Sequence, residues 1–187
     1  MSRIKFYPLK LTGMIQIDPF CAEDSRGFFM ETFQHEEYQA AGSPITFVQD
    51  NHSGSHRGLL RGLHYQIQQP QGKLVRVVAG EVFDVAVDLR RNSLTFGQWH
   101  GIYLSSQNKT MLWIPPGFAH GSYVLSEWAE FIYKTTDYYA PQWERTLLWN
   151  DPVLAIQWPL IDGCPPQVST KDAAGIPFQS AEVYEDL

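Results

Sequence analysis

Hydrophobic residues recur along this chain in short runs that alternate with polar residues or are rich in β-branched side chains. Gly, Pro, Asn and Ser residues separate these runs, a rhythm typical of short antiparallel strands rather than of alternating strands and helices. We therefore expect an all-β sandwich or barrel. The predicted strands are Gly27–Phe33, Thr46–Gln49, Leu59–Gln66, Leu74–Val78, Val82–Leu89, Gly101–Leu104, Met111–Ile114, Ser122–Leu125 and Phe131–Thr135.

Local patterns add detail to this outline. The stretch 75–87 predicts a hairpin that turns at Gly80. Its second arm would place Phe83, Val85 and Val87 on one face and Val82, Asp84, Ala86 and Asp88 on the other. One short helix is predicted over Gln34–Ala41, because Gly42 follows as a stop signal and begins the turn Gly42-Ser43-Pro44. The Pro-rich tail after Pro141 is expected to be irregular and to wrap over the barrel.

Length and composition then limit the class of protein. The chain has 187 residues and a net charge of −6, so we expect one domain over residues 1–187. The acidic balance argues against nucleic acid or an anionic membrane as the main partner. With only Cys21 and Cys164, neither a disulfide framework nor a thiolate zinc site is expected. The first 20 residues do not have the pattern of a signal peptide, and the chain has no apolar run long enough to span a membrane. A cytoplasmic location is therefore expected.

One segment departs from the acidic balance. Residues 51–80 contain no Asp or Glu but hold four Arg or Lys and three His residues. This segment is either a solvated basic face or an anion site, since Arg and Lys on adjacent strands can converge on phosphate oxygens. Arg61 and His64 lie on one apolar strand. A bulge at Gly62 would bring these two side chains to the same side.

A second constellation is Pro115-x-Gly117-x-x-His120, which resembles the second motif of cupins. The first cupin motif has two His residues one position apart, but here Gln66 stands where the second would follow His64. A metal site needs three or four ligands, so we expect no metal. His35, His52, His56 and His100 have no such support and are interpreted as ordinary histidines.

Taken together, several longer motifs resemble those of dTDP-4-dehydrorhamnose 3,5-epimerases. They occur in order from Asp24 to Asp172. These motifs are Asp24–Glu31, Gln49–Ser53, Leu60–Gln66, Lys73–Arg76, Gly80–Arg90, Pro116–Gly121, Tyr133-Lys134, Trp149–Asp151 and Ser169–Asp172. The ensemble is highly specific, although each short piece alone would be weak.

The resemblance implies a cupin-type antiparallel β-barrel, or jelly roll, that forms a homodimer and uses no metal and no cofactor. The implied reaction converts dTDP-4-dehydro-6-deoxy-D-glucose to dTDP-4-dehydro-L-rhamnose, on the route to dTDP-L-rhamnose and bacterial cell-surface polysaccharide.

The chemistry of this reaction suits the residues that match the family. C3 and C5 both adjoin the C4 ketone, so epimerisation needs a base on one face of the sugar and a proton donor on the other. His64 is the candidate base, because its ordinary pKa of about 6.5 is near working pH. Asp172 matches the family position for the carboxylate that orients it, and Asp84 is the competitor inside the barrel. Tyr133 matches the acid, and Lys73 would stabilise the enolate oxygen.

The resemblance also implies a set of substrate-binding residues. Arg61 would bind the diphosphate, with Arg26 as a second cation, and Gln49 and Asn51 would lie near the sugar or the phosphate. Glu31 would accept a hydrogen bond from the imide N–H of thymine, and Phe28 and Tyr139 would flank the base. His120 would line the sugar pocket. The segment of Arg26 and Glu31 could cross to the neighbouring barrel and complete its nucleotide site.

Three other functions stay open. The chain could be an epimerase that inverts only C3 or only C5, a metal cupin such as a dioxygenase, or a sugar-binding cupin without catalysis. The missing second His disfavours the metal enzyme. The combination of His64, Lys73, Tyr133 and Asp172 disfavours a pure binding protein.

Overall fold

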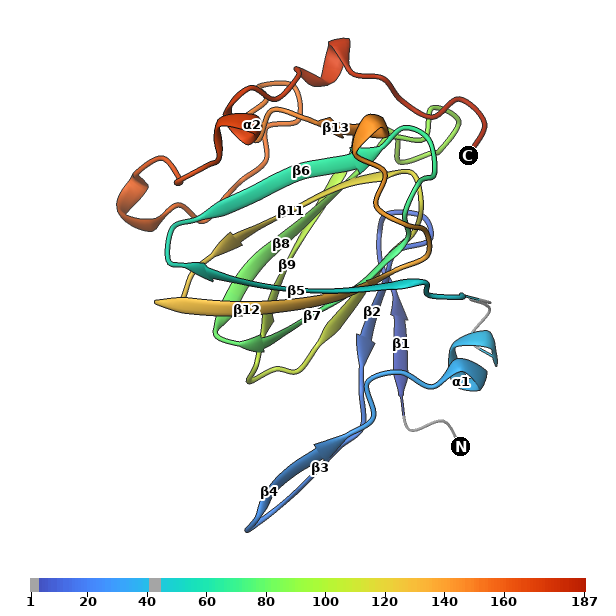
Figure 1. Cartoon of the computed structure of the whole chain (residues 1–187), viewed down its shortest axis with the longest axis vertical. Helices are drawn as coiled ribbons and strands as arrows, with labels where there is room; N and C mark the ends of the chain where they lie inside the picture. Colours follow the sequence, from blue (N-terminus) through green and yellow to red (C-terminus); the bar gives the residue numbers. More distant parts are fainter. Residues whose placement is uncertain (1–3, 41–44) are drawn as a thin grey trace.

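The computed structural model describes residues 4–40 and 45–187. Two antiparallel sheets face each other and form a cupin-type jelly roll (Figure 1). The first sheet has the order β1-β2-β10-β7-β12-β5 and the second has the order β13-β6-β11-β8-β9. The strands of the first are β1 (Lys5–Pro8), β2 (Ile15–Asp18), β5 (Gln49–His56), β7 (Lys73–Ala79), β10 (Met111–Ile114) and β12 (Trp128–Thr135). Those of the second are β6 (Leu60–Gln66), β8 (Glu81–Asp88), β9 (Trp99–Ser105), β11 (Phe118–Val124) and β13 (Glu144–Thr146).

The main core lies between the two sheets. β7 contributes Val75 and Val77 to it, and β8 contributes Val82 and Ala86. The alternate residues of β8, such as Val85, belong to a second apolar cluster on the opposite face of the same sheet. The predicted division of this strand into two faces is therefore confirmed.

The C-terminal tail covers that outer face of the second sheet, where Leu147, Leu154 and Tyr184 pack against β8 residues. The tail consists mainly of loops with short helices, η1 (Pro141–Trp143), η2 (Ile161–Gly163), α2 (Thr170–Ala173) and η3 (Phe178–Ser180). Figure 1 shows it as orange and red segments beside β6, with β13 among them. An irregular tail wrapped over the barrel was predicted and is confirmed, and its path brings α2 against β6.

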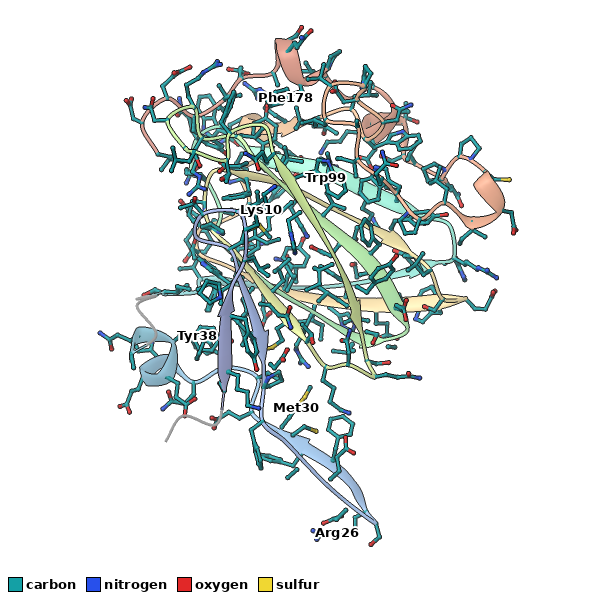
Figure 2. The ribbon with its side chains drawn as sticks, turned by 180° about the vertical axis from the view of Figure 1, so that it is seen from behind. Lys10, Arg26, Met30, Tyr38, Trp99 and Phe178 are labelled. Atoms are coloured by element: carbon teal, nitrogen blue, oxygen red, sulfur yellow. The ribbon has the colours of Figure 1, made fainter. Side chains whose placement is uncertain are left out.

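Two N-terminal elements lie outside the barrel. β3 (Cys21–Asp24) and β4 (Gly27–Met30) pair only with each other and project as a hairpin, with Arg26 at its tip in Figure 2. The predicted strand Gly27–Phe33 is therefore correct only in its first part. α1 (His35–Ala40) confirms the predicted helix, while the predicted turn at 42–44 falls outside the described residues.

The predicted hairpin at Gly80 is wrong. β7 and β8 flank this residue, but they belong to different sheets, so the chain crosses from one sheet to the other. Gly80 has φ +73°, and a Cβ there would lie 2.0 Å from the carbonyl oxygen of Trp128. The glycine is thus required for a tight crossing rather than for a turn between paired strands.

β5 was also misjudged, because the strand covers Gln49–His56 where the prediction ended one strand at Gln49 and began the next at Leu59. Its eight residues are nearly all polar, so it has no apolar alternation to mark it as a strand. The N-terminal strands β1 and β2 were not predicted either. Within the described ranges, no helix is long and apolar enough to span a membrane.

Candidate active site

A bulge in β6 sets the geometry of the site. His64 pairs with His120 of β11, while Arg61 pairs with Ser122. An advance of three residues along β6 is therefore matched by an advance of only two residues along β11. Arg61 and His64 therefore share one face, as the sequence predicted. Gly62 makes this possible, since a Cβ there would lie 2.6 Å from Cα of Gly121.

His64 forms a dyad with Asp172. The Nε2 atom of His64 lies 2.5 Å from Oδ1 of Asp172, and the two side chains are 29% and 5% exposed. Asp84, the competing partner, lies instead 2.9 Å from Nε2 of His120. The structure therefore pairs each of these two histidines with its own carboxylate, and Asp172 is the partner of His64.

Asp172 is held by the start of α2. Its backbone N–H donates to Oγ of Ser169, which caps the helix. Burial acts to raise the pKa of Asp172, but the hydrogen bond and charge of His64, with further bonds from Ser169 and the backbone of Gly62, keep this pKa below its ordinary value. The carboxylate is therefore ionised at neutral pH and can stabilise a charged imidazole.

Tyr133 and Lys73 face His64 from the other sheet. They lie on β12 and β7, and both line the same pocket as His64. Burial raises the pKa of Tyr133 above its ordinary value, and burial lowers the pKa of Lys73 to about 8. A ligand between the sheets would thus meet an imidazole on one wall and a phenol and an ammonium on the other.

Tyr139 closes one side of this pocket from the loop after β12. Its backbone N–H donates to Oε1 of Gln49 at 2.9 Å, and its hydroxyl donates to Oε2 of Glu144 at 2.7 Å. Gln49 in turn donates from Nε2 to Oδ1 of Asn51 at 2.9 Å. The Nδ2 group of Asn51 is buried and has no protein partner, so it is a donor available to a ligand.

Two further predicted residues lie close by. Arg61 donates from Nε to Oγ of Ser55 at 3.0 Å, and its positive charge acts on Tyr133. His120 is buried beside Phe131, with ring centroids 6.0 Å apart, and is not among the residues that line the pocket.

The remaining predicted residues lie away from the pocket of their own chain. Arg26 is at the tip of the β3–β4 hairpin, where it pairs with Asp24 at 2.6 Å (Figure 2). Phe28 on the same hairpin is 60% exposed, and Lys109 lies over its ring at 5.0 Å. Glu31 follows directly after this hairpin and is exposed.

Sequence reasoning missed several polar residues of the site, among them Glu144 and Gln66. Glu144 lines the pocket, and Gln66 is buried beneath the loop of Tyr139. The sequence shows that Gln66 replaces the second His of the motif, but no local pattern indicated that its side chain would bind the backbone on either side of Tyr139. Among the described residues, no three His, Cys, Asp or Glu side chains form a group able to hold a metal ion.

This arrangement can transfer protons on both faces of one bound molecule. A base backed by a carboxylate lies on the second sheet, a phenol lies on the first, and a cation near them can stabilise an oxyanion.

Comparison with known proteins identifies relatives that are similar to this chain in sequence and in fold. A family model described as dTDP-4-dehydrorhamnose 3,5-epimerase matches residues 8–180. The dTDP-4-dehydrorhamnose 3,5-epimerase of Pseudomonas aeruginosa is 57% identical over 177 residues, which cover 94% of this chain and 97% of that protein.

Solved structures agree with the sequence comparison. A dTDP-6-deoxy-D-glucose-3,5-epimerase from Legionella pneumophila, in complex with dTDP-4-keto-L-rhamnose, superposes with a TM-score of 0.94 at 50% identity and covers 98% of this chain and 99% of its own. ChmJ, a 3′-monoepimerase from Streptomyces bikiniensis in complex with dTDP-quinovose, has a TM-score of 0.86 at 33% identity, with 93% and 88% covered.

Proposed function

The chain belongs to the dTDP-4-dehydrorhamnose 3,5-epimerase family, and on this premise we propose that His64 and Tyr133 transfer the protons of its reaction from opposite walls of the barrel. The enzyme is an isomerase that converts dTDP-4-dehydro-6-deoxy-D-glucose to dTDP-4-dehydro-L-rhamnose in the dTDP-L-rhamnose route. The observation that carries the proposed mechanism is that His64 and Tyr133 line one pocket but come from different sheets.

Each inversion, at C3 or at C5, follows the same order of proton transfers. The imidazole of His64 removes the proton from the carbon next to the C4 ketone, and the C–H electron pair forms the enolate. Lys73 stabilises the negative charge on the C4 oxygen. Tyr133 then gives its hydroxyl proton to the opposite face of the same carbon. Asp172 stabilises the imidazolium while it carries the proton. Exchange with solvent resets both groups before the next inversion.

Binding of the nucleotide is proposed for the other polar groups. Arg61 lies beside the pocket as a cation for the diphosphate. The free donor of Asn51 suits a sugar or phosphate oxygen, and the ring of Tyr139 can flank the thymine. The role of His120 at the sugar stays a prediction, because its ring is buried and its Nε2 atom pairs with Asp84.

We also propose a homodimer in which the β3–β4 hairpin of one chain completes the site of the other. This proposal is supported by the position of Arg26 at the tip of a hairpin that projects from its own barrel, and by the exposed aromatic surface of Phe28 on that hairpin. Arg26 would be the second phosphate cation, Glu31 would accept from the thymine imide, and Phe28 would lie against the base.

The single-site epimerase is the alternative with a specific observation in its favour, since the 3′-monoepimerase ChmJ shares the fold. Deuterium exchange separates the two functions. The enzyme is incubated with dTDP-4-dehydro-6-deoxy-D-glucose in D₂O, and C3 and C5 are followed by NMR. A double epimerase labels both carbons, because each inversion passes through a planar enolate. Label at one carbon would establish a single epimerase, and label at neither would refute the epimerase mechanism.

A further inference from the structure

Glu144 is a carboxylate in the catalytic pocket that the mechanism above does not use. It lies in the edge strand β13, where it pairs with Gln66 of β6, and it lines the same pocket as His64, Lys73 and Tyr133. Its side chain is only 14% exposed. A nearly buried carboxylate beside a base, an acid and an ammonium group affects the charge of each of them.

The contacts of Glu144 join two separate parts of the site. Its Oε2 atom accepts the hydroxyl proton of Tyr139 at 2.7 Å and also pairs with Nζ of Lys171. Lys171 directly precedes Asp172 on α2, a helix of only four residues. One carboxylate therefore ties the loop that closes the pocket to the helix that orients His64.

Glu144 is ionised at neutral pH. Burial acts to raise its pKa, but hydrogen bonds from Lys171 and Tyr139, together with the charges of Lys171 and His64, hold the pKa below its ordinary value. Its negative charge in turn acts to raise the pKa of both Lys73 and Tyr133.

Other charged groups also face these two residues. Asp84 of β8 acts on Lys73 in the same direction as Glu144, and Arg61 of β6 acts on Tyr133 in the opposite direction. Burial opposes the charged form of Lys73, so nearby negative charge is what keeps this ammonium protonated in the pocket.

We propose that Glu144 is a positioning residue of the epimerisation, whose carboxylate fixes α2 against the loop of Tyr139 and holds negative charge beside Lys73 and Tyr133. This inference rests on the proposed function, because it assigns Glu144 to the protonation of two groups that the mechanism requires in their protonated forms. Its specific consequence is that Glu144 sets the upper limit of the pH range in which the enzyme works.

The test is the pH profile of kcat/KM for Glu144→Gln. The alkaline limb of this profile reports the acids of the free enzyme. It should move to lower pH by about half a pH unit or more, because a neighbouring negative charge is gone. Glu144→Asp keeps the charge and should keep the limb near that of the parent. Lys171→Met removes the ion pair but leaves the carboxylate, so it should not lower the limb.

The control is Glu127→Gln, which removes a similar pair with Arg57 on the exposed surface and should leave the profile unchanged. An alkaline limb of Glu144→Gln at the parent position would overturn the inference. An equal downward shift in Lys171→Met would also overturn it, since the ion pair and not the charge would then be responsible. If the parent labels C3 and C5 with deuterium, such results reject only the role of Glu144. If the parent labels neither carbon, the proposed function itself fails.

Discussion

At the scale of single residues, Lys73 illustrates how a group that we propose to be catalytic can oppose the stability of the fold. Burial lowers its pKa to about 8 from the ordinary value of 10.5, so the folded protein disfavours the charged form. Below pH 8 both folded and unfolded chains carry the proton, and this penalty is constant. Between pH 8 and 10.5 only the unfolded chain binds the proton at this site. The contribution of Lys73 to the free energy of unfolding therefore becomes more favourable as the pH rises through this range.

Lys73→Met should therefore stabilise the protein while it impairs catalysis. We expect the free energy of unfolding at pH 7 to rise by about 1–3 kcal/mol, because the buried charge is replaced by an apolar chain of similar length. The advantage should shrink towards pH 10. Turnover should fall about 100-fold through loss of enolate stabilisation. Urea denaturation at several pH values, with kinetics at pH 7, checks both parts. A variant less stable than the parent at pH 7 would contradict this explanation.

The residues of the dyad could be predicted only in part from sequence chemistry. The residue types required for a base and its carboxylate identified His64, but both Asp84 and Asp172 were possible partners. The fold decides between them, because Asp84 faces His120 across adjacent strands while Asp172 approaches from α2, more than 100 positions further along the chain. Sequence spacing carries no information on such a contact.

At the scale of elements, the strands with an apolar face were the predictable ones. β10 was predicted with its observed bounds, and β8 was predicted with both its faces. β5 was not, because its inward positions, among them Gln49 and Asn51, are polar groups of the site and its outward positions are also polar. Functional strands often break the pattern that would reveal them.

Gln66 shows what one strand residue does for a neighbouring loop. Its Nε2 group donates to the carbonyl oxygens of Gln69 and Tyr138, at 2.8 and 3.2 Å, and its Oε1 atom accepts from the backbone N–H of Ala140 at 2.8 Å. The position where a metal cupin has its second His here holds the backbone around Tyr139.

Gln66→Leu should release this loop. The backbone groups of Tyr138 and Ala140 would lose buried partners, so we expect a loss of about 2–3 kcal/mol in unfolding free energy. KM should rise more than kcat falls, because in our proposal Tyr139 contacts the bound nucleotide. Gln68→Leu is the matched control, since that side chain is exposed on the same segment. A Gln66→Leu variant within about 0.5 kcal/mol of the parent, with unchanged KM, would argue against the tether.

At the scale of the whole molecule, the sequence predicted the two-layer barrel and its covering tail, but not how the chain moves between sheets. The sharp crossing at Gly80 was mistaken for a hairpin, because a glycine between two apolar runs is equally compatible with both. Of the projecting hairpin, β4 was predicted in part and β3 was not predicted. The partner surface of this hairpin, in our proposal, belongs to another chain.

A mixing experiment tests the shared site. His64→Asn and the double variant Arg26→Ala/Phe28→Ala should each be nearly inactive as homodimers. If hairpins are exchanged, mixed dimers contain one intact site, built from the native barrel of one chain and the native hairpin of the other. Equal mixing after denaturation and refolding should then restore roughly a quarter of the parent activity. No recovery in mixed dimers, verified by a tag on one chain, would show that each chain uses its own hairpin.

In our proposal His64 and Tyr133 act on opposite faces of the sugar, and deuterium exchange in the Tyr133→Phe variant is the decisive test of this mechanism. With the nucleotide sugar in D₂O, His64 of this variant still removes protons, but the donor on the opposite wall is absent. Exchange at C3 and C5 should therefore continue with configuration largely retained, as followed by NMR. His64→Asn, which lacks the base, should show no exchange at either carbon. Inversion by Tyr133→Phe at the parent rate would contradict the two-wall mechanism.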